Sequence, residues 1–240
     1  MKNHILLEIT YPNKCAACDE IIPEDKFLCD YCAVCIKNTE YKKVCTRCGL
    51  QKDNCRCKNR EFHFAGIIGA YKNEGIARKA YYSYKMGRRA ELADFFAKSC
   101  AAAIKEVFAD IKFDAVFSVP TAHRSRLKRG FDHSELIAQK IAGILGVNYV
   151  RGFLKTRHFR PLQHKSEFAK RLENVRGKYY TDKKIGASNV LLFDDIFTTA
   201  ATLDECAKEL MFAGAGNVYC VSVLSTYLKK KHSGEKKNGN

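Results

Sequence analysis

The residues with the most specific chemistry are cysteines that occur in close pairs near the start of the chain. Nine of the twelve cysteines lie between Cys15 and Cys57. Each close pair places two thiolates on a tight turn, and two such pairs complete a tetrahedral site for Zn²⁺. Residues 15–57 are therefore predicted to hold one or two zinc ions rather than a framework of disulfides. The predicted ligands are Cys15, Cys18, Cys29, Cys32, Cys45, Cys48, Cys55 and Cys57.

The sequence leaves several features of this cysteine module open. Either consecutive or interleaved pairs could share a metal, and Cys35, the ninth cysteine, could compete as a ligand. Thiolates favour zinc over magnesium or calcium, and an iron–sulfur cluster is the alternative. Four thiolates leave zinc no open coordination position, so we expect the metal to stabilise the fold rather than to catalyse.

A second group of residues has the order expected of a phosphate-binding turn. In residues 190–203, VLLFDDIFTTAATL, an apolar strand ends in two acids, and a loop of small residues then leads into a helix. Amides at a helix N-terminus bind anions, hydroxyls add donors, and the acids can accept hydrogen bonds from a sugar. Thr202 and Glu205 have the spacing of a capping box. The predicted ligand-binding residues are Asp194, Asp195, Thr198, Thr199, Ala200, Ala201 and Thr202.

The formal net charge of +16 is concentrated in the middle of the chain. Residues 121–178 contain fourteen Lys or Arg and four Asp or Glu. Such a segment attracts polyanions, and basic residues mixed with Phe159 and Phe168 are typical of surfaces that bind single-stranded nucleic acid. A solvated, solubilising surface is the alternative. The predicted nucleic-acid contacts are Arg124, Arg126, Lys128, Arg157, Arg160, Lys165 and Arg171.

Alternating strand and helix patterns predict how these groups are positioned. We expect strands in residues 61–72, 115–119, 147–150, 190–193 and 218–224, and helices in 90–108, 134–145 and 202–212. Asp132 or Ser134 can cap the second helix, and Gly146 ends it. Residues 151–178 are expected to be a long loop with short elements. This order predicts an α/β fold with a parallel sheet flanked by helices, whose ligands lie beyond the carboxyl ends of the strands.

The organisation expected for the whole chain has three parts. Residues 1–60 form the cysteine-rich module, 61–228 the α/β domain, and 229–240 a polar, disordered tail. The apolar stretches are too short to cross a bilayer, and the N-terminus does not have the pattern of a secretory signal. We therefore expect a cytoplasmic protein without membrane insertion.

With these motifs in view, the chain resembles two related groups of proteins. Residues 190–203 are similar to the phosphoribosyl-pyrophosphate (PRPP) motif of type I phosphoribosyltransferases, and together with the cysteine module they resemble the ComF family of competence-associated proteins. The resemblance runs from about Leu6 to Tyr227. It includes Tyr71 to Gly75, Lys85-Met86-Gly87, Ser118-Val119-Pro120, Arg129-Gly130-Phe131, Gln163, and Arg171 with Asn174-Val175 before Tyr179.

The resemblance implies a type I phosphoribosyltransferase-like sheet with a small double zinc-ribbon module in front of it. It implies that Asp194 and Asp195 contact ribose hydroxyls, that residues 198–202 hold a 5′-phosphate, and that the loop after Val119-Pro120 holds the pyrophosphate. It also implies that Arg129 contributes to the PRPP site, with Mg²⁺ accompanying PRPP. The chain departs from the family at Ala200, where glycine is usual. It also departs at Asp132-His133, where Asn-Gln is usual.

Three functions follow from the resemblance and the charge. The first is a ComF-like role in DNA uptake and transformation, in which the protein handles incoming single-stranded DNA together with proteins of the competence machinery. The second is a phosphoribosyltransferase, an enzyme of the pentosyl glycosyltransferase class, acting on an unknown nitrogen acceptor. The third is a zinc-ribbon adaptor for protein partners. Whether the chain is an enzyme stays open, because the sequence contains no base-specificity element that we recognise.

Overall fold

The computed structural model describes residues 12–38, 44–49, 55, 57, 61–87, 89–120, 132–157 and 175–226. No helix among these residues is long and apolar enough to cross a membrane. Part of the predicted basic surface and the predicted tail lie outside the described residues. The site residues concerned are Arg124, Arg126, Lys128, Arg129, Arg160, Lys165 and Arg171.

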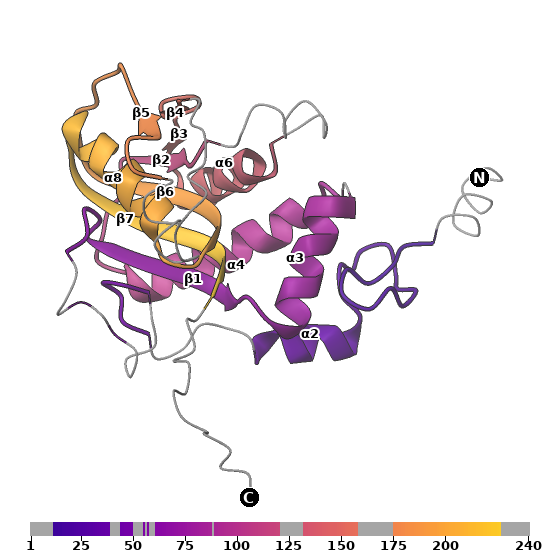
Figure 1. Ribbon diagram of the computed structural model, residues 1–240. Helices are drawn as coiled ribbons and strands as arrows, with labels where there is room; N and C mark the ends of the chain where they lie inside the picture. The colour runs from indigo at the N-terminus through magenta and orange to yellow at the C-terminus, as the bar shows by residue number, and fades with distance from the viewer. Residues whose placement is uncertain are drawn as a thin grey trace, which may run out of the picture.

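A five-stranded parallel sheet forms the centre of the molecule (Figure 1). Its order is β1-β7-β6-β2-β3, and every neighbouring pair is parallel. The strands are β1 (Gly66–Lys72), β2 (Ala115–Ser118), β3 (Asn148–Tyr149), β6 (Ala187–Phe197) and β7 (Ala215–Ser225). Parallel sheets are usually covered on both faces, and the apolar side chains of these strands are accordingly buried.

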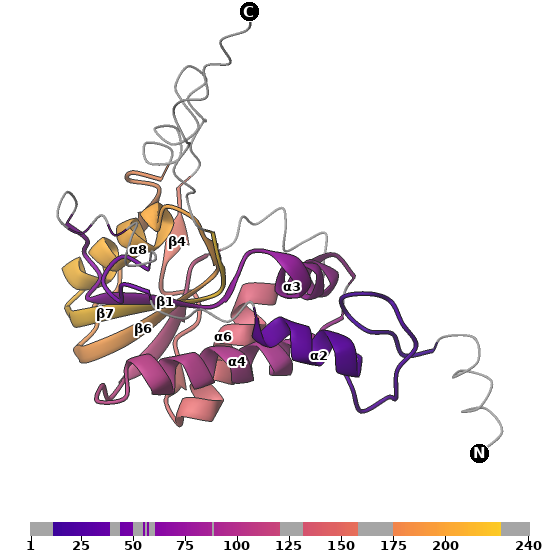
Figure 2. The same cartoon turned by 90° about the horizontal axis from the view of Figure 1, so that it is seen from below.

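Helices cover the two faces of the sheet (Figure 2). One face carries α3 (Gly75–Gly87), α4 (Leu92–Val107) and α6 (His133–Leu145). The other carries α8 (Ala201–Phe212) and a small antiparallel pair, β4 (Lys155–Thr156) with β5 (Tyr179–Tyr180). Because side chains alternate along a strand, Leu191 and Phe193 enter the core under α4 and α6, whereas Val190 and Leu192 enter the core under α8. The predicted α/β fold with a parallel sheet between helices is confirmed.

Local signals predicted some boundaries well. Asp132 caps α6 by accepting hydrogen bonds from the amides of Ser134 and Glu135, and Gly146 ends it at φ 71°. The sequence analysis did not anticipate α3 or the short helix α2 (Asp30–Lys37). The buried face of α3 consists of alanine and tyrosine at helical spacing, a pattern that lacks the aliphatic residues by which amphipathic helices are usually identified.

The turn after β6 differs from the prediction. The strand continues through both acids to Phe197, because it pairs with β7 as far as Ser225. The helix α8 then begins at Ala201, with Ala200 as its N-cap and no side-chain cap. The capping box predicted for Thr202 and Glu205 is therefore wrong, and Glu205 instead accepts a 2.7 Å hydrogen bond from the Gly177 amide.

Candidate functional site

The two acids of the predicted PRPP motif lie at the carboxyl edge of the central sheet, on β6. Asp195 is buried, and both of its carboxylate oxygens are engaged. Lys85 of α3 donates to Oδ2 at 2.6 Å, and the hydroxyl of Ser134 at the start of α6 donates to Oδ1 at 2.6 Å. Asp195 thus joins the strand end to two helices that lie 110 and 61 positions away in the sequence.

The neighbouring acid Asp194 has the opposite electrostatic environment. Burial is the largest influence on both carboxyls and raises their pKa values. At Asp195 the charge and hydrogen bond of Lys85, with the Ser134 hydroxyl, outweigh burial, so its pKa is lowered below the ordinary value. At Asp194 burial and the adjacent Asp195 charge raise the pKa to about 7. The pair therefore combines one firmly ionised acid with one that titrates near neutral pH.

Consecutive side chains of a strand project to opposite faces, which separates the two acids. Asp195 points to the side of α3 and α6, where its partners lie. The charge of Asp194 raises the pKa values of Tyr179 of β5 and Cys206 of α8, on the other face, and it also acts on Lys85 and Tyr81 of α3. Asp194 is also only partly buried. Of the two carboxyls, Asp194 lies on the side of the sheet where the predicted phosphate loop leads into α8.

The segment Thr198–Thr202, hereafter the phosphate loop, connects β6 to α8. Ala200 has φ 57°, a left-handed conformation that alanine adopts only at some cost in free energy. The Ala201 amide is 3.3 Å from the Thr199 hydroxyl, and the Asp204 amide donates to Ala200 O at 2.8 Å. The side chains of Thr198, Thr199 and Thr202 are partly exposed. This loop resembles the geometry with which helix N-termini bind anions.

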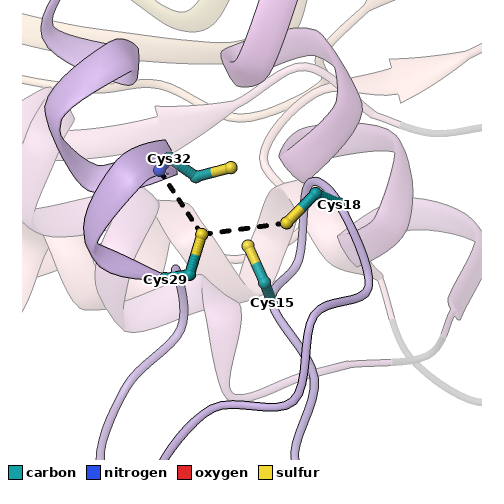
Figure 3. Close-up of side chains that lie close together, drawn as sticks. All are labelled: Cys15, Cys18, Cys29 and Cys32. Carbon is teal, nitrogen blue, oxygen red and sulfur yellow. Dashed lines mark hydrogen bonds between the residues drawn. The ribbon is translucent and has the colours of Figure 1, made fainter.

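The cysteines form two groups of four within the described residues, and consecutive pairs share a group. Figure 3 shows the sulfur atoms of the first group, Cys15, Cys18, Cys29 and Cys32, facing a common centre. Cys45, Cys48, Cys55 and Cys57 form the second. In both groups all four ligand atoms lie within 4.8 Å of one another, and the interleaved arrangement is not observed. Cys35 belongs to neither group.

The donor sets fit zinc. Four sulfurs bound tetrahedrally at 2.3 Å would stand about 3.8 Å apart. The Sγ–Sγ distances are 3.7 Å for Cys18 and Cys29, and 3.5 Å for Cys45 and Cys57. For Cys48 and Cys55 the distance is 3.8 Å. Zinc bound here would fix the turns that carry the cysteines and would leave no coordination position for a substrate.

The first cysteine group is built into the α/β core. Cys15, Cys29 and Cys32 belong to the same hydrophobic cluster as Tyr81 and Phe96, and Phe27 packs against Phe95 of α4 with ring centroids 6.5 Å apart. Arg89 also donates to Lys14 O at 2.6 Å. This part of the module therefore packs directly against α3 and α4.

Basic and aromatic side chains gather on the β4–β5 pair. The guanidinium of Arg157 lies 5.1 Å from the centroid of the Tyr180 ring, and Lys155 Nζ lies 6.0 Å from it. Lys178 lies 5.5 Å from the centroid of Tyr179. Arg157 is the one predicted nucleic-acid contact among the described residues, and the structure adds Lys155, Lys178 and Tyr180 to its surroundings. We call these four residues the basic ribbon.

The sequence analysis did not select Lys85 or Ser134 as site residues. Lys85 was part of a family motif but had no role assigned, and nothing local in the sequence reveals a partner 110 positions away. Asp194 and Asp195 lie at the same strand end as the phosphate loop, as expected from the order of the segment. The loop after Pro120 and Arg129 lie outside the described residues.

Comparisons with known proteins give relatives of low identity. No family model matches the chain. A DNA utilization protein YhgH from Salmonella typhi is 24% identical over 199 residues, covering 78% of this chain and 86% of that protein. The protein of the same name from Escherichia coli K12 is 22% identical over 201 residues, covering 79% of this chain and 88% of that protein.

Solved structures of phosphoribosyltransferases are also similar. An adenine phosphoribosyltransferase shows 17% identity and a TM-score of 0.38, covering 58% of this chain and 73% of its own. A purine phosphoribosyltransferase from Pyrococcus horikoshii shows 14% identity and a TM-score of 0.36, covering 56% and 80% respectively. The α/β fold assignment rests on the strand order and helix layers described above.

Proposed function

We propose that this chain is a ComF-like competence protein that handles incoming single-stranded DNA in natural transformation and carries a PRPP-type phosphate pocket. The observation that carries the proposal is the position of the basic ribbon. Its strand β5 packs against α8, the helix whose N-terminus follows the phosphate loop. The strand that carries Tyr180 of the basic ribbon and the predicted phosphate loop thus both adjoin α8. The relatives named DNA utilization proteins support the connection with DNA.

The basic ribbon has the components of a single-strand binding surface. Bases stack on aromatic rings and on arginine guanidinium planes, while lysine and arginine neutralise phosphates. Arg157 is exposed, and Tyr180 is partly exposed. Lys155 forms a 3.0 Å ion pair with exposed Asp182, which solvent and salt screen. A DNA phosphate can therefore compete for this cation at little cost.

Replacing Tyr180 by Ala tests this surface. We expect Tyr180→Ala to weaken binding of a fluorescein-labelled thymidine oligonucleotide by about 1–3 kcal/mol, because one stacking platform is lost. Tyr180→Phe should retain binding. Tyr82 on α3 offers a matched control, since Arg78 lies 5.6 Å from its ring centroid. Equal losses in Tyr82→Ala and Tyr180→Ala, or an affinity that does not fall with added salt, would contradict the proposal.

We propose PRPP as the ligand of this pocket. The phosphate loop would hold the 5′-phosphate of PRPP with its amides and hydroxyls, and ionised Asp194 would accept hydrogen bonds from the ribose hydroxyls. Mg²⁺ would accompany PRPP and neutralise part of its charge. Asp195 would act less directly, since Lys85 and Ser134 already occupy its two oxygens.

A phosphoribosyltransferase is the second candidate function. It is favoured by the acid with a pKa of about 7 beside the phosphate loop, at the carboxyl edge where α/β enzymes bind ligands. The reaction would break the bond from ribose C1 to pyrophosphate and form one from C1 to a nitrogen acceptor. Pyrophosphate release from PRPP and Mg²⁺, screened over nucleobases, tests it. Bound PRPP without release for any base would leave the pocket as a binding site.

A further inference from the structure

The second cysteine group packs directly against the strand end that precedes the phosphate loop. Gly49, which follows Cys48, has φ +68°. A Cβ built on Gly49 would lie 2.7 Å from Cζ of Phe197 and 3.0 Å from Cγ2 of Ile67. The backbone of the cysteine turn therefore lies against the ring of Phe197. That residue is 3% exposed and immediately precedes Thr198.

A main-chain hydrogen bond holds the same turn on the edge of the sheet. The Ile67 amide of β1 donates to Thr46 O at 2.6 Å. β1 is an edge strand and pairs with β7 on its other side. The Thr226 amide, just beyond β7, in turn donates to Phe197 O at 2.9 Å. The turn that begins at Cys45 is thus hydrogen-bonded to the edge strand β1 at Ile67, and through Gly49 it lies against the ring of Phe197.

The segment that follows the second group contacts the first turn of α8, just after the phosphate loop. The His63 amide donates to Oδ1 of Asp204 at 2.7 Å, and the His63 ring lies 3.3 Å from the same oxygen. Asp204 is in the first turn of α8. The phosphate loop is therefore flanked by two contacts from this region, at Phe197 before it and at Asp204 after it.

We propose that the second cysteine group positions the phosphate loop, with Gly49 and Phe197 as the positioning contact. Zinc held by Cys45, Cys48, Cys55 and Cys57 would fix the turn that carries Thr46 and Gly49, so its loss would release the support under Phe197. Metal binding and anion binding at the loop are then coupled, and the coupling is reciprocal. The contacts of Gly49 and His63 are enough to infer that the loop is positioned. The effect on ligand affinity rests on the proposed function.

Amide hydrogen exchange on the zinc-loaded full chain tests the positioning without any ligand. Cys55 and Cys18 are the exposed members of the second and first groups, so Cys55→Ser and Cys18→Ser form a matched pair. We expect Cys55→Ser to speed exchange in residues 194–204 about tenfold. We expect Cys18→Ser to act on α2 and α3 instead, and Cys35→Ser to change neither. Unchanged exchange in Cys55→Ser, or equal acceleration in both group variants, would overturn the proposal.

A second variant tests the contact between Gly49 and Phe197 without removing a zinc ligand. Phe197→Leu keeps all eight ligands but shortens the side chain that Gly49 contacts. It should retain the zinc content of the wild type and still accelerate exchange in residues 198–202. Normal exchange there with full zinc content would show that the Gly49–Phe197 contact does not position the loop.

The coupling between ligand and metal can be measured as the effect of PRPP on zinc release. PRPP with Mg²⁺ should slow chelator-driven zinc release from the second group about tenfold in wild type and less in Phe197→Leu. Absence of PRPP binding with accelerated exchange in Cys55→Ser would refute the PRPP pocket and leave the positioning intact. PRPP binding that leaves zinc release unchanged would refute the coupling.

Discussion

Two adjacent acids in this chain, Asp194 and Asp195, lie in different environments because they project to opposite faces of the sheet. Asp195 is held by Lys85 and Ser134 and lies between two helices. Asp194 projects to the opposite face, toward α8, and its pKa is raised to about 7. The motif predicted that both would be ligand contacts. The alternation of side chains along β6 instead makes Asp194 the better candidate for a direct contact, and Asp195 the better candidate for holding the strand end in place.

The raised pKa of Asp194 predicts a pH-dependent effect of Asp194→Asn. The folded state retains this proton up to about pH 7, whereas the unfolded chain loses it near its ordinary pKa of 3.8. The contribution of Asp194 to stability therefore falls as pH rises between these values. Asparagine is neutral throughout, so the variant should be little changed at about pH 4 and more stable than wild type by about 2–3 kcal/mol at about pH 8. Urea unfolding of both proteins measures this, and a stability difference that does not vary with pH would contradict it.

Removal of the Lys85 charge predicts a large loss of stability. Lys85→Met leaves the Asp195 carboxylate buried without its cation, which should cost about 2–3 kcal/mol because Lys85 is itself partly exposed. Lys140→Met breaks the 2.7 Å pair with half-exposed Asp94 and should cost about 0–1 kcal/mol. Chemical unfolding of the two variants compares them directly. Adding Asp195→Asn to Lys85→Met should recover part of the loss, and equal costs for the two lysines would argue against the role of Lys85.

At the scale of elements, the cysteine turns hold short segments that bury too little apolar surface to be stable alone. The helix α2 has eight residues, is capped by the Cys29 side chain, and is too short to be stable alone. It is held by the first cysteine group and by packing against α3. The turn of the second group is hydrogen-bonded to the edge strand β1 through Thr46 and Ile67. Each group therefore contacts a different part of the α/β domain.

The arrangement of the cysteines predicts two zinc ions per chain. Elemental analysis of purified protein should give two for wild type and for Cys35→Ser, because Cys35 lies outside both groups. Cys18→Ser and Cys55→Ser should each retain one, since three thiolates bind zinc more weakly than four. A single zinc in wild type, or loss of zinc in Cys35→Ser, would show that the grouping is wrong.

The sequence predicted elements with strong local signals and missed those that depend on distant contacts. The helix after Asp132 was predicted with its cap and its terminating glycine, because both signals are local. The extent of β6 was underestimated, since its last residues are extended by pairing with β7. In the site, the order of the acids and the phosphate loop was readable. The ion pair with Lys85 and the contact of Gly49 with Phe197 join distant segments and leave no local pattern.

At the scale of the whole molecule, the parallel sheet brings together groups from separate parts of the chain. The acids and phosphate loop lie at its carboxyl edge, Lys85 and Ser134 secure that edge from one face, and α8 with the basic ribbon covers the other. Gly49, next to the second cysteine group, lies against Phe197 at the end of the strand that leads into the loop. A phosphorylated ligand at this edge would therefore contact a region to which both cysteine groups are connected by packing.

The most direct test of this account is calorimetric titration of PRPP and Mg²⁺ into the full chain at about pH 8, where Asp194 is ionised. We predict saturable binding in wild type and an affinity at least about tenfold lower in Asp194→Asn, since a charge-assisted hydrogen bond is lost. Asp182→Asn, which removes an exposed acid outside the pocket, should bind as wild type does. Absence of binding in wild type, or equal affinity in Asp194→Asn, would contradict the central claim that this strand end and loop form a sugar-phosphate site.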